Sequence, residues 1–434
     1  MIKDELRYAQ ELIDFIYGSP SPFYAVKNIK EMLKKCGFDE IKECDRWNLD
    51  KGGKYFVTKN DSALIAFTTG KKYIPETGFK IVGAHTDSPT FRIKPSPEMI
   101  SENSYVKLNT EVYGGPILNT WLDRPLSIAG RVTVKSDNIL FPETKLLNIE
   151  KPLLIIPNLA IHMNRKMNDG VKLNNQVDML PIIGLVNESL ENDNYLISLI
   201  ADELNVSCDQ ILDFDLVLYE YNKGCIMGGN NEFVSSSRLD DLEMVHAGVS
   251  ALMNSDISDG TNVLACFDNE EVGSATKQGA DSNFLSNVLE RLVLVEGGDR
   301  EDFFRSLDRS FMISSDSAHA VHPNRGEKCD PTNRPHINEG PVIKISANQK
   351  YTSDSNSVSV YEAICKKAGV PCQKFVNRSD EAGGSTIGPI SSTHIPIRSV
   401  DIGTALLAMH SIRELCGVLD HSYVEKSFEE FYNL

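Results

Sequence analysis

The chain has 434 residues, of which 41% are hydrophobic and 24% charged, and its 44 basic and 61 acidic residues leave a formal net charge of −17. At about 150 residues per domain, this length favours two or three domains and is long enough for a sizeable core. The acidic balance argues against nucleic acid and anionic membrane surfaces as main partners. The net charge does not exclude an acidic small substrate, because the electrostatic potential at a binding site can differ in sign from the net charge.

Nine cysteines are scattered along the chain without a C-x-x-C pair. This excludes a zinc ribbon or a thioredoxin-type site and is typical of reduced thiols in the cytoplasm. The N-terminal segment carries acids inside its first apolar stretch, which indicates an amphipathic helix rather than a signal peptide. No run of about 18 apolar residues is present, so we expect no membrane-spanning segment. We therefore expect a cytoplasmic protein.

The first 90 residues predict two helices followed by strands. Apolar residues spaced near 3.6 predict a helix over 6–16, and a second helix is expected over about 24–35. Strands are predicted at 55–58, 63–68 and 79–84, and the last ends in His85-Thr86-Asp87.

The sequence pattern changes between residues 90 and 235, where short segments typical of strands alternate with Asn and Pro residues. Strands are predicted at 127–135 and 151–157, while Pro181 interrupts the apolar stretch 179–186. We expect a separate, mostly β unit here.

After residue 236 the pattern alternates between strand and helix. Helices are predicted at 239–253, 283–293 and 354–368, strands at 262–267, 311–314, 341–345 and 397–401, and a final helix region within 405–415. Such alternation predicts an α/β sheet covered on both faces.

Four short clusters carry the side chains that could perform chemistry. Three follow predicted strands and the fourth starts a predicted helix: GAHTD at 83–87, FDNEEVG at 267–273, SSDSAH at 314–319 and RLDD at 238–241. A lone His410 lies among apolar neighbours, as a core histidine would. Ligands bind at the carboxyl edge of open α/β sheets, so we place a candidate site at these strand ends.

Taken singly, these residues also fit structural roles. His85 fits a surface loop, Asp240 fits a helix start, and the other acids fit turns or first helical turns. Together, two histidines and several carboxylates could hold a pair of divalent metal ions. Asp87 could then fix the tautomer of His85. One of Glu270 and Glu271 could bind metal while the other acts as general base.

At this point the chain resembles the aspartyl aminopeptidase family of metallopeptidases. The matching segments follow one another along almost the whole length: GAHTDSP at 83–89, TWLDRPLSIAGRV at 120–132, NLAIHMNR at 158–165, SRLDDL at 237–242, DNEEVGS at 268–274, SDSAHAVHPN at 315–324, GPVIK at 340–344, STIGPI at 385–390 and AMHSIRE at 408–414. So many long motifs in one order are far more specific than any single one.

The resemblance implies roles for individual residues. Five fall on metal positions, with Asp240 as the bridge: His85, Asp240, Glu271, Asp316 and His410. Glu270 falls on the catalytic base, and Asp87 falls on the acid that orients His85. Substrate contacts are implied for four residues: His162, His319, Lys344 and Tyr351. His162 would reach the active site of the partner subunit in a dimer, and Lys344 is a candidate for receiving an acidic substrate side chain.

The resemblance also implies the architecture. We expect an α/β mixed-sheet catalytic domain built from residues 1–90 and 236–434, covered by helices, with an inserted β-rich dimerisation domain at 91–235. Two divalent ions per subunit are implied, zinc foremost with cobalt or manganese as alternatives. The expected substrates are peptides with a free N-terminus, preferably Asp or Glu. Dimers would assemble into a tetrahedral dodecamer, and the Asp240-Asp241 peptide is a candidate for the cis form.

Two alternative functions stay open at this stage. A related di-metal carboxypeptidase or deacylase would share the metal chemistry, although the DNEEVGS and AMHSIRE segments argue against it. A non-catalytic assembly protein on the same scaffold is disfavoured by the complete set of five ligand candidates plus Glu270. One segment, 325–339, does not map onto the family pattern throughout. We interpret it as an ordinary surface loop, with a role in substrate access as the alternative.

Overall fold

A computed structural model describes residues 2–186 and 194–434 of the chain. The chain forms two compact units. The first unit comprises residues 1–87, 224–409 and 414–434, and the second comprises residues 88–223 and 410–413. The second unit therefore interrupts the first immediately after Asp87.

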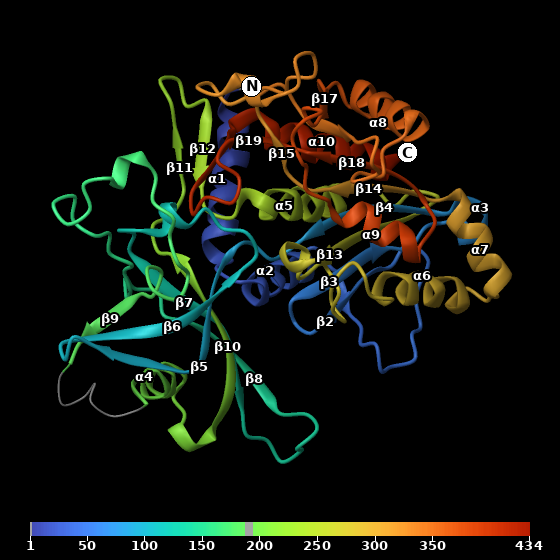
Figure 1. Ribbon diagram of the computed structural model, residues 1–434. Coiled ribbons are helices and arrows are strands. Elements are labelled where there is room, and N and C mark those ends of the chain that lie inside the picture. The colour runs from blue at the N-terminus through green and yellow to red at the C-terminus, as the bar shows by residue number, and fades with distance from the viewer. Residues whose placement is uncertain (1, 187–193) are drawn as a thin grey trace. The chain divides into compact units, whose positions relative to one another are not determined.

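The first unit is built on a sheet of nine strands in the described part of the chain, in the order β1-β2-β3-β13-β4-β14-β18-β16-β17 (Figure 1). The strands are β1 (Asp39–Glu40), β2 (Lys54–Lys59), β3 (Ala63–Thr68), β4 (Phe79–His85), β13 (Thr261–Phe267), β14 (Phe311–Ser315), β16 (Val342–Ile345), β17 (Gln373–Val376) and β18 (Arg398–Gly403). The four central strands β13, β4, β14 and β18 run parallel, whereas β3 and β16 pair with them antiparallel. The predicted mixed α/β class is confirmed.

Helices cover both faces of this sheet. They are α1 (Ile2–Gly18), α2 (Pro22–Lys35), α5 (Leu239–Asn254), α8 (Ser355–Ala368) and α10 (Val418–Asn433) on one face, and α3 (Ile74–Thr77), α6 (Phe284–Val295), α7 (Arg300–Arg309) and α9 (Ile387–His394) on the other. Strand side chains alternate between the two layers, so that Val82 packs with the first group of helices and Ile81 with the second. Sheets buried on both faces have near-continuous apolar strands, as β3 and β13 do.

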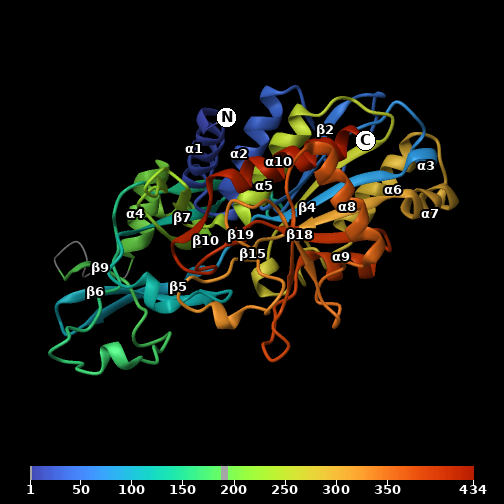
Figure 2. The ribbon, with the colours of Figure 1, turned by 90° about the horizontal axis from the view of Figure 1, so that it is seen from above.

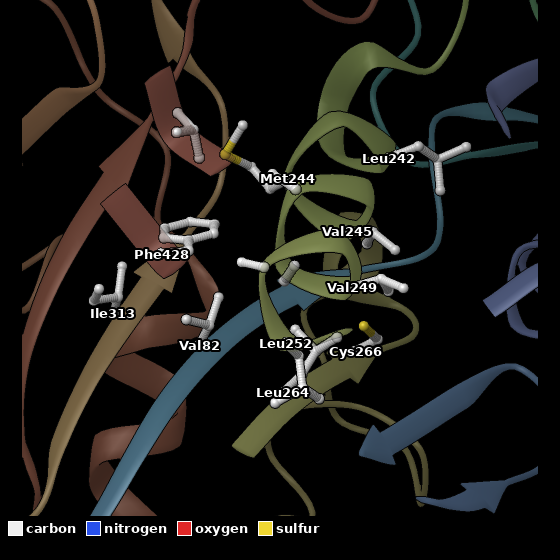
Figure 3. Close-up of a cluster of buried hydrophobic side chains, with 14 of the residues drawn as sticks. Val82, Leu242, Met244, Val245, Val249, Leu252, Leu264, Cys266, Ile313 and Phe428 are labelled. Carbon is white, nitrogen blue, oxygen red and sulfur yellow. The ribbon is translucent and has the colours of Figure 1, made fainter. Parts of the chain in front are cut away.

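Helix α5 lies at the centre of the first helical layer (Figure 3). Nearly all of its side chains are buried, polar ones such as Glu243 and His246 included, so the helix is enclosed on every side rather than amphipathic with a solvent face. Val245 and Leu252 pack in the same cluster as Leu264 of the sheet and Phe428 of α10. This packing fixes the start of α5 relative to the ends of the central strands.

The second unit contains a six-stranded antiparallel sheet among its described residues, in the order β8-β7-β10-β5-β6-β9 (Figure 1). Figure 2 shows β5, β6 and β9 of this sheet from above. The strands are β5 (Thr90–Ser101), β6 (Tyr105–Tyr113), β7 (Leu126–Val134), β8 (Glu143–Asn148), β9 (Ile182–Leu185) and β10 (Ile211–Glu220). Helix α4 (Tyr195–Leu204) packs against this sheet through Leu196 and Ile200. The sequence predicted short strands here, yet β5 has 12 residues and β10 has 10.

Smaller elements complete the first unit. Two small sheets, ordered β11-β12-β20 and β15-β19, are built from β11 (Cys225–Met227), β12 (Phe233–Ser236), β15 (Ala318–His319), β19 (Ala405–Leu406) and β20 (Glu414–Gly417). A 3-10 turn, η4, spans Glu270–Val272. Within residues 2–186 and 194–434, no helix combines the length and the apolar character needed to cross a membrane.

Two predicted elements are wrong. Region 405–415 contains no helix, because its apolar residues are buried by strand pairing: β19 pairs with β15, and Leu407 bridges to Leu415. The last helix is α10, which begins only at Val418. The predicted strand at 151–157 makes only isolated bridges at Leu154 and Ile155, in a stretch bounded by two prolines that cannot donate to a ladder. Helices α4, α7 and α9 were not predicted.

Candidate metal centre

Three neighbouring parallel strands of the first unit deliver their final residues to one edge of the sheet. Strand β4 ends in His85, β13 leads into the η4 turn with Glu270 and Glu271, and β14 leads directly into Asp316. Because β13, β4 and β14 are adjacent and parallel, these ends meet side by side. This is the edge at which ligands bind in open α/β sheets.

Asp87 contacts His85 and both glutamates at this edge of the sheet. Its carboxylate Oδ1 lies 3.3 Å from Nδ1 of His85, which faces Asp87, and also accepts the backbone N–H of Glu270 at 3.1 Å. Its Oδ2 accepts the backbone N–H of Glu271 at 3.2 Å. One fully buried carboxylate thus directs the ring of His85 and holds the turn that carries both glutamates.

The start of α5 supplies two further acids. The Asp240-Asp241 peptide is cis, as the resemblance implied, and both residues depart from helical geometry. Asp240 Oδ1 lies 3.7 Å from Nε2 of His85, and Asp241 Oδ2 accepts the backbone N–H of His85 at 3.0 Å. Glu414 accepts the backbone N–H of Asp240 at 3.0 Å and so fixes this turn from the other side.

The possible ligand atoms of this cluster lie close together. One atom each from His85, Glu270 and Asp316 lies within 4.8 Å of the other two, and the same holds for His85, Asp240 and Asp241. Oxygens of Asp240 and Glu271 also lie within 4.8 Å of each other. The structure therefore brings together His85 and all the acidic residues of the first unit that were predicted to form the site.

The electrostatics of the cluster follow from burying several acids together. Burial, together with the nearby charges of Asp316, Asp87 and Asp240, raises the pKa of Glu270 to about 8 although His85 opposes the shift. Burial also raises the pKa of Asp316 and, more strongly, that of Asp241. Packing carboxylates this closely is unfavourable unless a cation lies among them.

The donor set fits divalent metal. Imidazole and carboxylate are the ligands of catalytic zinc sites, and His85 presents Nε2 to the acids while Asp87 faces its other nitrogen. Asp241 Oδ1 is buried and has no hydrogen-bond partner among the described residues. A divalent cation would offset the acidic charge that burial alone makes unfavourable.

A second group of predicted residues lies around Phe375 of β17. Lys344 is buried on β16, and its Nζ lies 3.1 Å from Asp316 Oδ1 and donates to the carbonyl oxygen of Ser317 at 3.1 Å. Tyr351 is buried, with its ring 5.4 Å from Nζ of Lys344 and 6.5 Å from the ring of Phe375. His319 is exposed and packs edge-on against the same ring at 5.9 Å. Three of the four predicted substrate residues are thus near one another.

A cavity of about 570 Å³ is lined in part by Ile345, the residue that follows Lys344. Its lining includes Ile345, Lys350, Val376 and Arg378, together with Asp330 from segment 325–339. The segment is ordered by its own hydrogen bonds, such as that from Asn333 N–H to Asp330 at 2.8 Å. Only this one residue of the segment lines the cavity.

The remaining two predicted residues belong to the second unit. His410 has a left-handed backbone, with φ of 66°, and its Nδ1 lies 3.1 Å from the carbonyl oxygen of Gly115. Donation of Nδ1–H to that carbonyl presents Nε2 as the ligand nitrogen, the arrangement that metal-binding histidines favour. His162 lies on an exposed loop between the apolar residues Ile161 and Met163.

Sequence reasoning missed Asp241 and Glu414 as members of the site. Asp241 was included in the RLDD cluster and as the partner of a possible cis peptide but was given no role of its own, yet it accepts a hydrogen bond from the backbone of His85. Its adjacency to Asp240 was a usable signal. Glu414 lies far from Asp240 in the sequence, and no spacing pointed to their contact.

Gly403 on β18 also supports the site by its lack of a side chain. A Cβ there would lie 1.9 Å from the carbonyl oxygen of Asp316. We expect Gly403→Ala to displace Asp316, to cost about 1–3 kcal/mol of unfolding free energy, and to weaken metal affinity about tenfold or more. Gly229→Ala is the matched control, since its Cβ would meet no atom within 4 Å. Chemical denaturation and metal titration of both variants check this, and indistinguishable results would contradict it.

A mixed α/β sheet with buried imidazole and carboxylate groups at its strand ends defines the class as a metal-dependent hydrolase. Residues 15–432 match the aminopeptidase I zinc metalloprotease (M18) family. The chain belongs to this family and is a metallo-aminopeptidase.

A curated relative and two solved structures are similar to this chain over almost its whole length. The probable M18 family aminopeptidase 2 of Clostridium acetobutylicum is 73% identical over 433 residues, with 100% of both chains covered. Among solved structures, a chain of the Ape4 and Nbr1 complex has a TM-score of 0.95 and 38% identity, covering 99% of this chain and 86% of that chain. The mApe1 dodecamer of S. cerevisiae has a TM-score of 0.85 and 28% identity, covering 98% and 96%.

Proposed function

We propose that this aminopeptidase removes N-terminal residues, preferably Asp or Glu, from peptides with a free α-amine, with Glu270 as general base. The observation that carries the proposal is the position of Glu270. One of its oxygens lies within 4.8 Å of ligand atoms of both His85 and Asp316, and its backbone is held by Asp87. A carboxylate fixed beside a metal centre is placed to move the proton of an attacking water.

The proposal includes two divalent ions, zinc foremost, with cobalt or manganese as alternatives. The residues that would hold them are His85, Asp240, Glu271, Asp316 and His410, with Asp240 between the two. When bound, the ions would supply Lewis-acid activation of water and of the peptide carbonyl.

The chain's own residues would carry the protons. Glu270 would take a proton as the carbonyl carbon is attacked and return it to the leaving amine. Burial among acids raises the pKa of Glu270 to about 8 in the absence of metal, and the positive charge of bound cations would lower it again and leave Glu270 able to accept the proton as a carboxylate. Asp87 would keep His85 in one tautomer throughout, since it faces Nδ1 and leaves Nε2 directed at Asp240.

Cationic and polar groups next to the cluster support the preference for an acidic first residue. The ammonium of Lys344 has three donors, two of which meet Asp316 and Ser317. The neighbouring cavity contributes the cations Lys350 and Arg378. His319 and Tyr351, which flank Phe375, are proposed to contact the substrate.

The second unit is proposed to form the dimer. Several of its apolar side chains are strongly exposed, which marks surfaces that bind other proteins: Ile139, Leu140, Phe141, Met163 and Val177. We extend the proposal to a tetrahedral dodecamer assembled from dimers, supported by the dodecameric relative. We also place the protein in the cytoplasm, on the scattered cysteines of its sequence.

His162 is exposed and is followed in the sequence by the exposed Met163, and we propose that it completes the active site of the partner subunit. His162→Ala is therefore expected to lower kcat by about 10²-fold, the effect of losing one group that stabilises an oxyanion. Metal content should stay unchanged. His336→Ala, which removes an exposed histidine from segment 325–339, is the control and should behave like wild type. Unchanged kinetics for His162→Ala would refute the cross-subunit role.

One assay tests the function as a whole. The protein is loaded separately with Zn²⁺, Co²⁺ and Mn²⁺, and kcat/KM is measured on matched peptides that vary only in the first residue. Peptides with a free amine and an N-terminal Asp or Glu should be cleaved fastest. Equal cleavage of N-blocked peptides would favour a carboxypeptidase or deacylase. No hydrolysis with any metal would favour a non-catalytic assembly protein.

A further inference from the structure

A second buried group of potential metal ligands lies between helices α5 and α10. His246 belongs to α5, and His421 and Glu425 lie four residues apart on α10, so they share one face of that helix. One ligand atom from each of the three lies within 4.8 Å of the other two. None of them belongs to the candidate metal centre, and His246 lies about one and a half helical turns beyond Asp241.

The three side chains are withdrawn from solvent. His421 is 0% exposed, and His246 and Glu425 are each 5% exposed. Phe15 of α1 covers the group, with its ring 5.1 Å from that of His246. The surrounding residues of α1, α5 and α10 form the apolar core of this layer. A polar group in such a place needs a partner for each of its atoms.

The hydrogen bonds within the cluster leave atoms unsatisfied. Nδ1 of His246 and Nε2 of His421 lie 2.9 Å apart, so one of these nitrogens donates to the other. Nδ1 of His421 and Oε2 of Glu425 are buried and have no hydrogen-bond partner among the described residues. The orphaned Oε2 of Glu425, together with two imidazole nitrogens that face each other, indicates a site that takes up a cation.

The protonation states suit a cation. Burial lowers the pKa of His246 to about 4, and burial next to His246 lowers the pKa of His421 well below its usual value. Both rings are therefore neutral near pH 7 and offer lone pairs. Burial, with Glu11 and Glu429 nearby, raises the pKa of Glu425 to about 7 even though Arg7 and Lys426 oppose this. The charges that face the cluster are thus mixed, and the cluster itself lacks a positive group.

We propose that His246, His421 and Glu425 bind one divalent transition-metal ion, zinc foremost, at a site separate from the catalytic centre. Two imidazoles and a carboxylate are a ligand set that zinc favours. Tetrahedral coordination at bonds of about 2.0–2.1 Å needs roughly 3.3 Å between the two nitrogens, a few tenths more than the present separation. The ring that donates in the histidine pair moves its proton to its other nitrogen, and Glu425 binds as the carboxylate.

Such an ion would act as a structural tie. It would join α10, near the end of the chain, to α5, whose first residues include Asp240 and Asp241 of the candidate metal centre. Three protein ligands leave the fourth position to water. Because a ligand that binds only the folded state stabilises the fold by an amount that grows with the logarithm of its concentration relative to Kd, added zinc should raise Tm through this site.

The test counts metal ions in variants of the full-length protein. Wild type, Glu425→Gln and the double variant His246→Gln with Glu425→Gln are loaded with Zn²⁺, gel-filtered and analysed by mass spectrometry for metal per chain. We expect the double variant to lose about one equivalent while kcat stays within twofold of wild type. Glu429→Gln, one turn further along α10, is the control and should keep the wild-type content.

Two readouts decide the outcome without reference to activity. In the Co²⁺-loaded protein, the difference spectrum between wild type and the double variant should show the visible bands of a tetrahedral site. The rise in Tm on adding Zn²⁺ should be smaller for the double variant than for Glu429→Gln. Equal metal content in wild type and the double variant overturns the proposal, however many ions the catalytic centre holds. Failure of the proposed peptidase reaction would leave this count unaffected.

Discussion

Glu270→Gln is expected to lower kcat by about 10²–10⁴-fold, the contribution of a positioned general base. The amide keeps the size of the carboxylate and can still accept hydrogen bonds, but it cannot take a proton. The backbone N–H of residue 270 would keep its bond to Asp87, so the turn that carries Glu271 should be preserved. Metal content should therefore match wild type, and single-turnover kinetics with metal analysis check both expectations.

Glu290→Gln is the matched control for this variant. Glu290 is a surface residue of α6, 3.8 Å from Arg300, and its loss should leave kcat unchanged. A Glu270→Gln enzyme with kcat within tenfold of wild type would show that another group acts as the base. A variant that also loses metal would instead assign Glu270 to the ligand set.

Lys344→Met is expected to lower the free energy of unfolding by about 3–5 kcal/mol in the metal-free protein. Lys344 and Asp316 form an ion pair with side-chain exposures of 3% and 12%, so removing the ammonium leaves a carboxylate buried without its counter-ion. A metal ion bound at Asp316 would supply positive charge in its place. The loss should consequently be smaller in the metal-loaded protein, and denaturation with and without Zn²⁺ measures the difference.

Lys374→Met provides the comparison on the neighbouring strand. Lys374 pairs with Glu362 at the surface, with side-chain exposures of 43% and 42%, and such pairs contribute about 0–1 kcal/mol. Equal destabilisation by both variants would contradict the importance of burial. A Lys344→Met enzyme that keeps its stability but loses its preference for acidic peptides would assign Lys344 to the substrate instead.

The parallel core of the fold was predictable because it is buried on both faces. Strands such as β13 and β14 are fully buried and mostly apolar, so their limits were predicted to within one residue. The sheet of the second unit was harder. Strands such as β8 are half exposed and carry a mixed burial pattern, so their residues show no clear alternation. Strand pairing also removed the helix expected at 405–415.

The strand-end acids were predictable for a topological reason. Chemistry-bearing residues after consecutive parallel strands must share an edge, and His85, Glu270 and Asp316 do. Contacts between residues that only the tertiary fold brings together could not be predicted from the local sequence pattern. The pairing of Lys344 with Asp316 joins a strand interior to a loop, and Glu414 reaches Asp240 across most of the first unit's chain length. The role of His162 rests on the family resemblance alone, and that of His410 on the resemblance and on the need for a second histidine ligand.

The interruption of the first unit after Asp87 has a consequence for biosynthesis. Strand β4 is made early, but both of its sheet neighbours, β13 and β14, are made only after residues 88–223 of the second unit have been synthesised. His85 and Asp87 are therefore synthesised long before their partners Glu270, Glu271 and Asp316, which follow the inserted residues. A second unit that folds first would shorten the loop that β4 must close. The proposed metal ligands are therefore complete only late in synthesis, when His410 follows Asp316 out of the ribosome.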